Sequence, residues 1–344
     1  FAHNMKKGYV EGYYGKLFSF NDRLKLLDDL GEYGLDTYFY CPKEDPNHRL
    51  DWQSGYSEAW MNHFKELSSN ARSKNVEFIM GISPGINLDI DKLTHIIKSF
   101  ISIGITSIGI LFDDLENNPK AEIQCECINK IAEINPNLNL YFVPFVYCDH
   151  QLNKDNASKN YISYLADNLN QKVNIFWTGP KVVSDKYKET DIKRWKAMLN
   201  HNLYIWDNFF ANDYCMPKII IDDFNHLNPI KKADGLSGIL MNGTGIYNID
   251  KLLQEIFFQY MQNDNFDYKK LLLEKGFGLD SIYSLLKFEI KLKDIENLNN
   301  DLNNYLWKTN SYIKNDIYGH LHFLNFIHKN KISDKKILKR FNIV

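Results

Sequence analysis

Short apolar runs rich in β-branched and aromatic residues recur along the first two-thirds of the chain. Most are continuous rather than alternating, which is typical of strands buried on both faces of a parallel sheet. These runs predict strands at Gly8–Glu11, Thr37–Tyr40, Glu77–Met80, Ser107–Phe112, Leu140–Val143, Val173–Trp177, Leu203–Trp206 and Gly238–Met241.

Amphipathic segments lie between several of these runs. Apolar residues recur at helical spacing in Asn21–Tyr33, Ser57–Lys74, Leu93–Ile103 and Ile123–Ile134, which predicts helices there. Eight strands alternating with helices over about 250 residues are typical of an α/β (β/α)8 TIM barrel. A doubly wound open sheet is the alternative, but no G-x-G-x-x-G phosphate turn follows the first run.

The pattern changes after Gly245, where glycine and proline nearly vanish and helical spacing dominates. Asn248 or Asp250 could cap the last barrel helix, which is expected to run through Tyr260. We therefore predict a catalytic barrel domain at 5–262 and a small all-helical domain at 263–344. Helices are expected in the latter at 268–275, 282–307 and 312–329.

Composition and charge exclude several classes of protein. Of the 344 residues, 44% are hydrophobic and 24% charged, so a disordered or fibrous chain is excluded. A net charge of −2 does not imply a basic face, so neither nucleic acid nor an anionic membrane is an expected partner. No apolar run reaches the roughly 20 residues of a membrane helix. With Met5 as a natural start and no signal peptide visible, a cytoplasmic protein is expected.

Cysteine usage supports the same localisation. Cys41, Cys125, Cys127, Cys148 and Cys215 are an odd number and are scattered apart from one C-x-C pair, so we expect reduced thiols rather than disulfides. The C-x-C pair is expected at a buried helix edge, because no second Cys or His pair follows at metal-ligand spacing.

Polar and aromatic residues cluster just after the predicted strands. In a barrel of this kind, function collects at the carboxyl ends of the strands. Carboxylates and amides can bond sugar hydroxyls there, while aromatic rings cover the apolar face of a sugar. The segments concerned are Glu11–Gly15, Cys41–Asp45, Asp113–Glu116, Tyr147, Trp206–Asn208, Asn212–Tyr214 and Asn242.

Asp113 and Asp114 are the strongest single signal. Adjacent carboxylates raise the pKa of one of them, which allows one carboxyl to stay protonated as a general acid while the other is ionised. The plain alternative is a helix N-cap followed by a solvated acid. If the strand continued, Asp114 and Glu116 would share a face as a chitinase-type D-x-E pair. A third alternative uses Asp113, Asp114 and Glu116 to hold a divalent cation.

Six blocks of the sequence, in order, resemble glycoside hydrolase family 84. The blocks are Val10–Gly15, Tyr40–Asp45, Ile82–Gly85, Leu111–Asp114, Trp177–Ser184, and Trp206–Asn208 followed by Ala211–Tyr214. This family contains protein O-GlcNAcases and bacterial β-N-acetylglucosaminidases. The resemblance implies a retaining exo-β-N-acetylglucosaminidase on a TIM barrel, with no metal or organic cofactor. It also implies substrate-assisted catalysis, in which the 2-acetamido oxygen of the substrate attacks the anomeric carbon and forms an oxazoline.

Roles for individual residues follow from the same resemblance. Asp113 would orient the acetamido group and stabilise the oxazolinium, and Asp114 would act as general acid and then as base. An ionised Asp113 would help Asp114 to retain its proton. Substrate-binding roles are implied for the Gly12 carbonyl, Lys43, Asp213 and Asn242 at sugar hydroxyls, Asn208 and Tyr147 around the acetamido group and leaving oxygen, and Trp206 at its methyl.

The expected partner is therefore a GlcNAc-bearing glycoprotein, oligosaccharide or small glycoside. Two alternatives stay open at the level of sequence. One is a catalytically silent GlcNAc-binding module, and the other is a chitinase-type endo-glycosidase that uses Asp114 and Glu116. The oligomeric state is left open.

Overall fold

The computed structural model describes residues 5–116, 120–277, 280–297, 299–309 and 311–344. The chain divides into two compact units. The first comprises the chain up to Phe209 together with His226–Gly243, and the second comprises 210–225 and 244–344. This division places the helix that follows the last strand in the second unit, and the predicted domain boundary after residue 262 stays a prediction.

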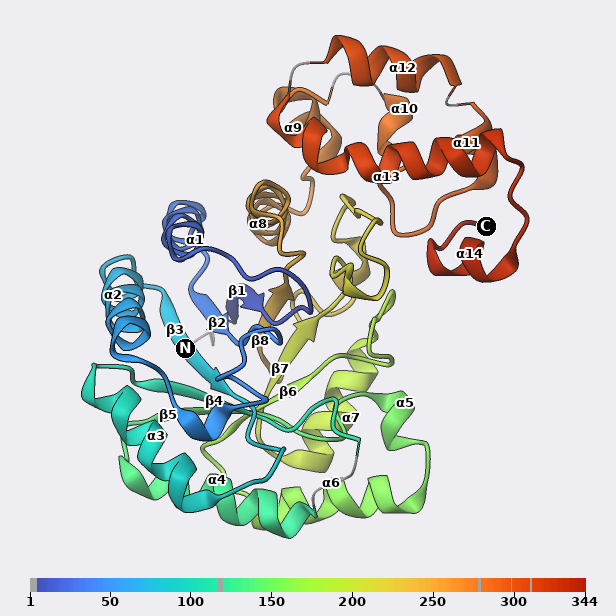
Figure 1. Ribbon diagram of the computed structural model, residues 1–344. Coiled ribbons are helices and arrows are strands. Elements are labelled where there is room, and N and C mark those ends of the chain that lie inside the picture. The colour runs from blue at the N-terminus through green and yellow to red at the C-terminus, as the bar shows by residue number, and fades with distance from the viewer. Residues whose placement is uncertain (1–4, 117–119, 278–279, 298, 310) are drawn as a thin grey trace. The chain divides into compact units, whose positions relative to one another are not determined.

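The first unit is built on a closed barrel of eight parallel strands (Figure 1). Each strand pairs with its neighbour in sequence, and the first closes on the last with Val10 opposite Asn242. The predicted barrel is confirmed and the open-sheet alternative is wrong. The strands are β1 (Lys6–Glu11), β2 (Thr37–Tyr40), β3 (Glu77–Ile82), β4 (Ser107–Leu111), β5 (Asn139–Val143), β6 (Asn174–Trp177), β7 (Asn202–Asp207) and β8 (Leu236–Asn242).

Large side chains fill the interior of the barrel. The Phe39 ring lies 5.4 Å from Phe176 and 5.8 Å from Trp206, centroid to centroid. A Cβ at Gly109 would overlap the Phe39 ring, so the smallest residue is needed on β4 where this aromatic cluster crosses it. The interior is therefore a packed core, and any binding site must lie above it at the strand ends.

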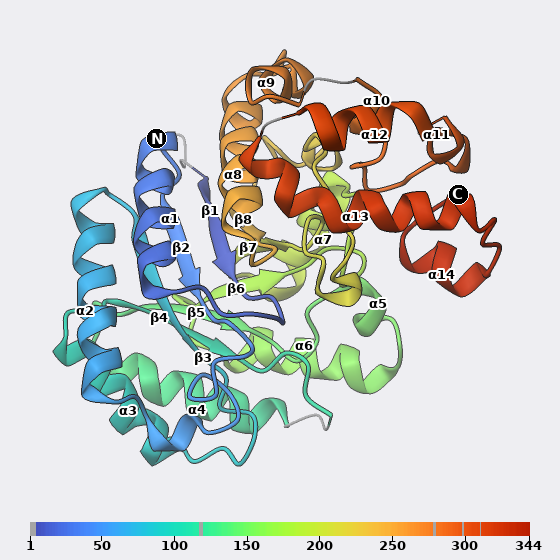
Figure 2. The ribbon, with the colours of Figure 1, turned by 45° about the horizontal axis from the view of Figure 1, so that its top comes forward.

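Helices follow most of the strands and surround the barrel (Figure 2). Each packs an apolar stripe inward, as α3 does with Leu93, Ile97 and Phe100. The four helices expected from periodicity are confirmed, whereas α6 and α7 were not singled out from the sequence. The helices are α1 (Phe20–Tyr33), α2 (Glu58–Ser73), α3 (Ile90–Ser102), α4 (Ala121–Ile134), α5 (Asp149–Leu152), α6 (Asn156–Asn168) and α7 (Glu189–Leu199).

All five cysteines are free and buried. Cys125 and Cys127 lie in α4, at 3% and 0% exposure, which confirms the helix-edge interpretation of the C-x-C pair.

The second unit consists mainly of helices. Its elements are η2 (Asp213–Cys215), α8 (Tyr247–Gln262), α9 (Tyr268–Glu274), α10 (Asp280–Tyr283), α11 (Leu292–Glu296), α12 (Asn299–Lys308), α13 (Tyr312–Lys329) and α14 (Lys335–Arg340). The start of α8 is stabilised by Asp250, whose carboxylate accepts hydrogen bonds from the backbone N–H groups of Thr244 and Gly245 at 2.8 and 3.1 Å.

The expectation of one helix over 282–307 is wrong, because α10, α11 and α12 are separate. Between them, backbone groups bond to distant parts of the chain. The Leu286 carbonyl accepts from Ile221 N–H at 2.8 Å, and Ile290 N–H donates to the Asn342 carbonyl at 2.9 Å. These partners replace the hydrogen bonds that a continuous helix would make.

No helix within the described ranges is both long and apolar enough to cross a lipid bilayer.

Candidate active site

The carboxyl ends of the barrel strands carry the polar residues singled out from the sequence. In a parallel barrel these ends lie on one face. The predicted site residues of the first unit fall into two groups. In one, Lys43 bonds to Asp113 and Tyr147 bonds to the adjacent Asp114. In the other, hydrogen bonds join Gly12, Trp206, Asn208 and Asn242.

Lys43 and Asp113 form a buried ion pair. The Lys43 Nζ atom lies 2.5 Å from Asp113 Oδ2, and the two side chains are 1% and 10% exposed. Lys43 comes from the segment after β2, where the Cys41 N–H donates to the Glu11 carbonyl at 3.0 Å. Burying two charges is costly unless their geometry is good, so the close pairing is what allows Asp113 to sit at this depth.

The pKa shifts of the pair follow from burial and charge. Burial raises the pKa of Asp113, Lys43 opposes that shift, and Asp114 adds to it, so the net direction is upward. Burial alone would lower the pKa of Lys43, but Asp113 and Asp114 raise it above its ordinary value. The expectation that Asp114 retains the shared proton stays a prediction.

Only one oxygen of Asp113 is used by the protein, as far as the described residues show. Lys43 occupies Oδ2, whereas Oδ1 is buried and accepts no hydrogen bond from a described residue. Buried polar atoms are normally satisfied, and an exception calls for an explanation. A ligand N–H group would satisfy this oxygen.

Asp114 has a different environment from its neighbour. Strand β4 ends at Leu111, and Asp114 adopts a left-handed backbone with a φ of 53°. Its side chain is exposed. Tyr147 Oη donates to Asp114 Oδ1 at 2.8 Å, and Tyr14 Oη donates to Oδ2 at 3.1 Å. Two adjacent residues thus supply one buried and one accessible carboxyl group.

This backbone geometry removes the structural premise of two alternatives for the acidic pair. Because β4 does not continue past Leu111, Asp114 and Glu116 do not alternate along a strand as the D-x-E interpretation assumed, and a catalytic role for Glu116 is left to experiment. Helix α4 begins at Ala121 with Lys120 as its N-cap, so neither aspartate caps it. Within the described ranges, no group of three or more His, Cys, Asp or Glu side chains is arranged to hold a metal, and Asp113 already has Lys43 as its cation.

The second group forms a chain of amide contacts. Asn242 Oδ1 accepts from Gly12 N–H at 3.1 Å, and Asn242 Nδ2 donates to Asn208 Oδ1 at 2.9 Å. The indole N–H of Trp206 donates to the same Asn208 oxygen at 2.8 Å. A Cβ at Gly12 would overlap the Trp206 ring, so this position requires glycine. The predicted role of the Gly12 carbonyl stays a prediction.

Three other strand-end carboxylates are bound to internal partners. Glu11 forms an ion pair with Arg23 at 2.7 Å and accepts from the Tyr38 hydroxyl. The remaining two have similar surroundings: Asp45 accepts from Tyr40 and Tyr56 at 2.7 and 2.6 Å, and Asp207 contacts His226 at 2.8 Å and Tyr187 at 3.2 Å. All three carboxylates are buried, which gives them structural roles.

Two residues of this region were missed at the level of sequence. Tyr14 lies in the block Glu11–Gly15, but only its neighbour Gly12 was assigned a role. Arg49 donates to the Tyr14 hydroxyl at 2.9 Å, and no pattern in the sequence connects the two.

Asp213 begins η2 in the second unit, and its role in sugar binding stays a prediction.

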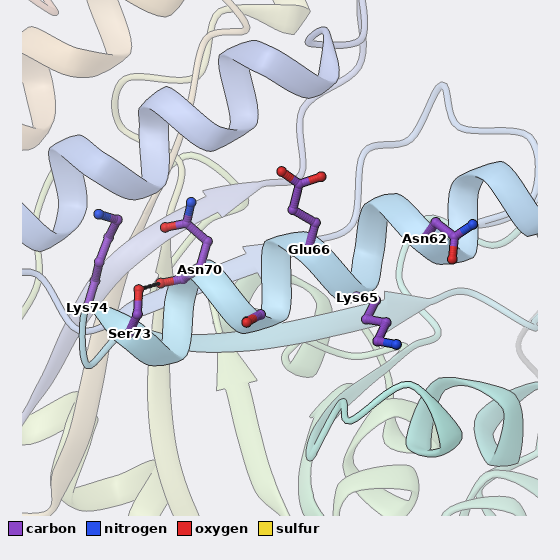
Figure 3. A pocket seen from close by; sticks show the side chains of 7 residues that line it. Asn62, Lys65, Glu66, Asn70, Ser73 and Lys74 are labelled. Atoms are coloured by element: carbon purple, nitrogen blue, oxygen red, sulfur yellow. Dashed lines mark hydrogen bonds between the residues drawn. The ribbon is translucent and has the colours of Figure 1, made fainter.

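A hollow elsewhere on the first unit carries no comparable chemistry. It has a volume of about 600 Å³ and is lined by Asn62, Lys65, Glu66, Ser69, Asn70, Ser73 and Lys74 (Figure 3). These residues all belong to α2 or its C-cap, and the Ser73 hydroxyl donates to the Asn70 carbonyl of the same helix at 2.7 Å.

The family model for beta-N-acetylglucosaminidase matches residues 7–274, which include all of the barrel strands except the first residue of β1 and include both aspartates. This chain belongs to the β-N-acetylglucosaminidase family of glycoside hydrolases. The resemblance to glycoside hydrolase family 84 seen in the sequence is confirmed.

Relatives and solved structures match between 68% and 99% of this chain. The protein O-GlcNAcases of Mus musculus and Rattus norvegicus are each 28% identical over an alignment of 252 residues, which covers 68% of this chain and 27% of theirs. The O-GlcNAc hydrolase of Thermobaculum terrenum, solved as an aspartate-to-asparagine variant, matches with a TM-score of 0.73 and 25% identity over 82% of this chain and 65% of that one. CpGH84B matches with a TM-score of 0.75 over 99% and 66%, and its 21% identity supports the fold alone. The chain spans about a quarter of the length of the two rodent relatives.

Proposed function

We propose that this barrel is a retaining exo-β-N-acetylglucosaminidase that removes terminal β-linked GlcNAc by substrate-assisted catalysis. The observation that carries the proposal is the state of Asp113. This carboxylate is buried, paired with Lys43 through Oδ2, and has Oδ1 without a donor among the described residues. A substrate 2-acetamido N–H is a donor of suitable chemistry for that oxygen.

The first step uses both aspartates. Asp113 accepts the acetamido N–H, which orients the amide oxygen toward the anomeric carbon and offsets the positive charge that develops on the oxazolinium. The bond from the anomeric carbon to the amide oxygen forms as the bond to the leaving oxygen breaks. Asp114 gives its proton to the leaving oxygen.

The second step reverses these roles. Asp114, now ionised, takes a proton from water as the water oxygen attacks the anomeric carbon and the oxazoline opens. Two inversions at the same carbon give net retention. The exposed position of Asp114 suits proton transfer to the leaving group and from water. The hydrogen bond from Tyr147 Oη to Asp114 Oδ1, at 2.8 Å, orients the carboxyl group.

Three of the other strand-end acids are poorly placed to act as an enzyme nucleophile. A two-carboxylate retaining glycosidase needs a second carboxylate about 5–5.5 Å from the acid, placed to attack the sugar. Glu11, Asp45 and Asp207 are buried and already accept hydrogen bonds from internal partners, so they are poor candidates for that role.

The amide group opposite the acids suits the sugar. Asn242, Asn208 and Trp206 form a linked set at the ends of β7 and β8, and this set provides polar atoms for hydroxyls beside an indole face. We assign Gly12, Lys43, Tyr147 and Asp213 to substrate binding as well, on the resemblance to the family. The aglycone is left to experiment: a protein Ser or Thr, another sugar or a small alcohol.

Turnover on three substrates tests the activity and narrows the aglycone. An aryl β-GlcNAc tests whether the enzyme hydrolyses the glycosidic bond when the leaving group is activated. Chitobiose tests whether it accepts a sugar as the aglycone, and a GlcNAc-modified peptide tests whether it accepts a protein aglycone. Hydrolysis of the aryl substrate is expected. Binding of GlcNAc without hydrolysis of any of the three would contradict the proposal and favour the silent binding module.

Two variants separate the proposed acid from the chitinase-type alternative. Asp114→Asn should lose most activity on a poor leaving group and much less on an activated aryl group, because only the former needs protonation. Glu116→Gln is the matched control and should keep most activity. A large loss in the control alone would point to Glu116 instead.

The oxazoline has its own test. A thiazoline analogue should inhibit the enzyme, and Asp113→Asn should reduce both this inhibition and the turnover of every substrate. A covalent glycosyl-enzyme trapped by mass spectrometry would rule out neighbouring-group participation.

A further inference from the structure

We infer that Arg49 is a positioning residue for the catalytic carboxyl Asp114 and acts on it through the hydroxyl of Tyr14. The inference rests on the proposed function, in which Asp114 is the general acid and base. It concerns a relay of two hydrogen bonds that starts in the segment after β2, passes through the segment after β1 and ends on the acid after β4.

The relay is visible in the contacts. Arg49 Nη1 donates to Tyr14 Oη at 2.9 Å, and Tyr14 Oη donates to Asp114 Oδ2 at 3.1 Å. The Arg49 guanidinium also lies over the Tyr14 ring, 5.4 Å from its centroid. The guanidinium therefore holds the phenol through both its hydroxyl and its ring face.

The direction of the hydrogen bonds gives Arg49 its effect. A guanidinium can only donate, whereas a phenol can donate or accept. With Arg49 donating to its oxygen, Tyr14 directs its own hydrogen to Asp114 Oδ2. This keeps Oδ2 as an acceptor and favours the carboxylate form, as the Tyr147 hydroxyl does at Oδ1.

Arg49 is itself held in place by its own loop. Its N–H donates to the Pro46 carbonyl at 3.4 Å, and the Asp51 N–H donates to the same carbonyl at 2.7 Å. Beside it, the His48 carbonyl accepts from Ser83 N–H at 2.8 Å, which ties the loop to the end of β3. A guanidinium on such a loop can fix the orientation of Tyr14.

Other charges act on the same acid and must be separated from Arg49. Among the described residues, the titratable and charged groups around Asp114 and Tyr14 include Lys43, Arg49, Asp113 and Tyr147. Lys43 is already paired with Asp113. Arg49 differs from Lys43 because it acts on Asp114 through the Tyr14 hydroxyl, and the Tyr14→Phe substitution removes this hydroxyl.

The experiment is a double-mutant cycle measured on two leaving groups. The variants are Arg49→Gln, Tyr14→Phe and their combination, each assayed for kcat/KM on an alkyl and on a dinitrophenyl β-GlcNAc. Arg49→Gln should lower kcat/KM on the alkyl substrate by about tenfold or more, because misplacing a catalytic group by 1 Å can cost about a hundredfold. The dinitrophenyl substrate, which needs no proton, should be little affected.

Two further readouts distinguish positioning from a general structural role. The alkaline limb of the kcat/KM profile on the alkyl substrate should move to higher pH in Arg49→Gln and in Tyr14→Phe, because both remove support for the carboxylate form. The double variant should be no worse than Tyr14→Phe alone. Arg49→Lys, which keeps the charge, should recover part of the loss.

Arg72→Gln is the matched control, because Arg72 lies on α2, is exposed and donates to the Gly104 carbonyl, away from the strand-end acids. Equal losses of Arg49→Gln on both substrates, or losses that multiply in the double variant, would overturn the inference. Asp114→Asn is measured alongside. If it shows no dependence on leaving group, the proposed function fails; if it does and Arg49→Gln does not, only the relay fails.

Discussion

Replacing Lys43 with methionine tests the ion pair on which the site depends. The substitution keeps most of the side-chain volume but removes the charge that lies 2.5 Å from Asp113 in a site where both side chains are at most 10% exposed. Removing one partner of a buried pair typically costs about 3–5 kcal/mol, because the other charge is left without compensation. An opposite charge at this distance typically lowers a carboxyl pKa by about 1–3 units.

The sign of the pH dependence follows from the causes of the shift. In the wild type, burial raises the pKa of Asp113 and Lys43 opposes it. Without Lys43, burial and Asp114 raise that pKa further. When the pKa of a carboxyl is higher in the folded than in the unfolded protein, the folded protein binds the proton more tightly. The free energy of unfolding is therefore largest while the carboxyl is protonated, and it falls as the pH rises toward the folded-state pKa. The variant should therefore be destabilised more at pH 8 than at pH 5, by up to about 3–5 kcal/mol.

Urea unfolding at several pH values, followed by tryptophan fluorescence, measures this difference. In parallel, the acid limb of kcat/KM on an aryl β-GlcNAc should move up by roughly 1–3 pH units, since Asp113 must be ionised to act. Lys130→Met is the control, because Lys130 pairs with Asp91 at 2.6 Å on an exposed surface, where such pairs contribute little. A loss of stability that is independent of pH, with an unmoved acid limb, would refute the reasoning.

Three shorter predictions concern other parts of the chain. Gly12→Ala should raise KM for aryl β-GlcNAc by about tenfold or more, because the new Cβ displaces the Trp206 ring; an unchanged KM would contradict this. Burial raises the pKa of Cys125 to about 11 and that of Cys127 to about 12, so neither should react with Ellman's reagent at pH 8 until urea unfolds the chain. Burial lowers the pKa of His320 to about 4, so stability should fall by about 3 kcal/mol as pH drops from 6.5 to 4, and His320→Gln should flatten that slope in urea titrations.

The strands could be predicted because their signal is local. A run buried on both faces is continuous in the sequence, and the barrel followed from eight such runs separated by helical segments. The helix expected at 282–307 failed for the opposite reason. The backbone in the middle of this segment bonds to Ile221 and Asn342, which are distant in sequence. No local pattern therefore indicates where the helix is interrupted.

The site shows the same division between local and distant information. The pair Asp113–Asp114 could be predicted as a candidate site because two adjacent acidic residues follow an apolar run. The contact of Arg49 with Tyr14 joins two loops 35 residues apart, and neither loop has a repeating pattern. Such a contact becomes visible only when the barrel brings the ends of β1 and β2 together.

Strand alternation explains which strand-end residues serve the site. Side chains two positions apart share a face of a strand, so a residue two or four positions beyond an interior side chain continues toward the barrel mouth. Interior Val10, Cys41, Leu111, Val143, Trp206 and Leu240 stand two or four positions before Gly12, Lys43, Asp113, Tyr147, Asn208 and Asn242. Only Asn242 still lies within its strand, so for the other five this spacing is a pattern in the sequence and their contacts define their placement. Glu11 and Asp207 have the opposite parity and bind Arg23 and His226 instead.

Asp114 is the exception to this parity, and its backbone accounts for it. By alternation it would turn away from the barrel mouth as Glu11 and Asp207 do. Its left-handed conformation, with a φ of 53°, instead brings the carboxylate to Tyr14 and Tyr147. A left-handed residue other than glycine is uncommon, though aspartate tolerates it better than most. The strained turn is therefore what allows two adjacent carboxyl groups to serve one site in different environments.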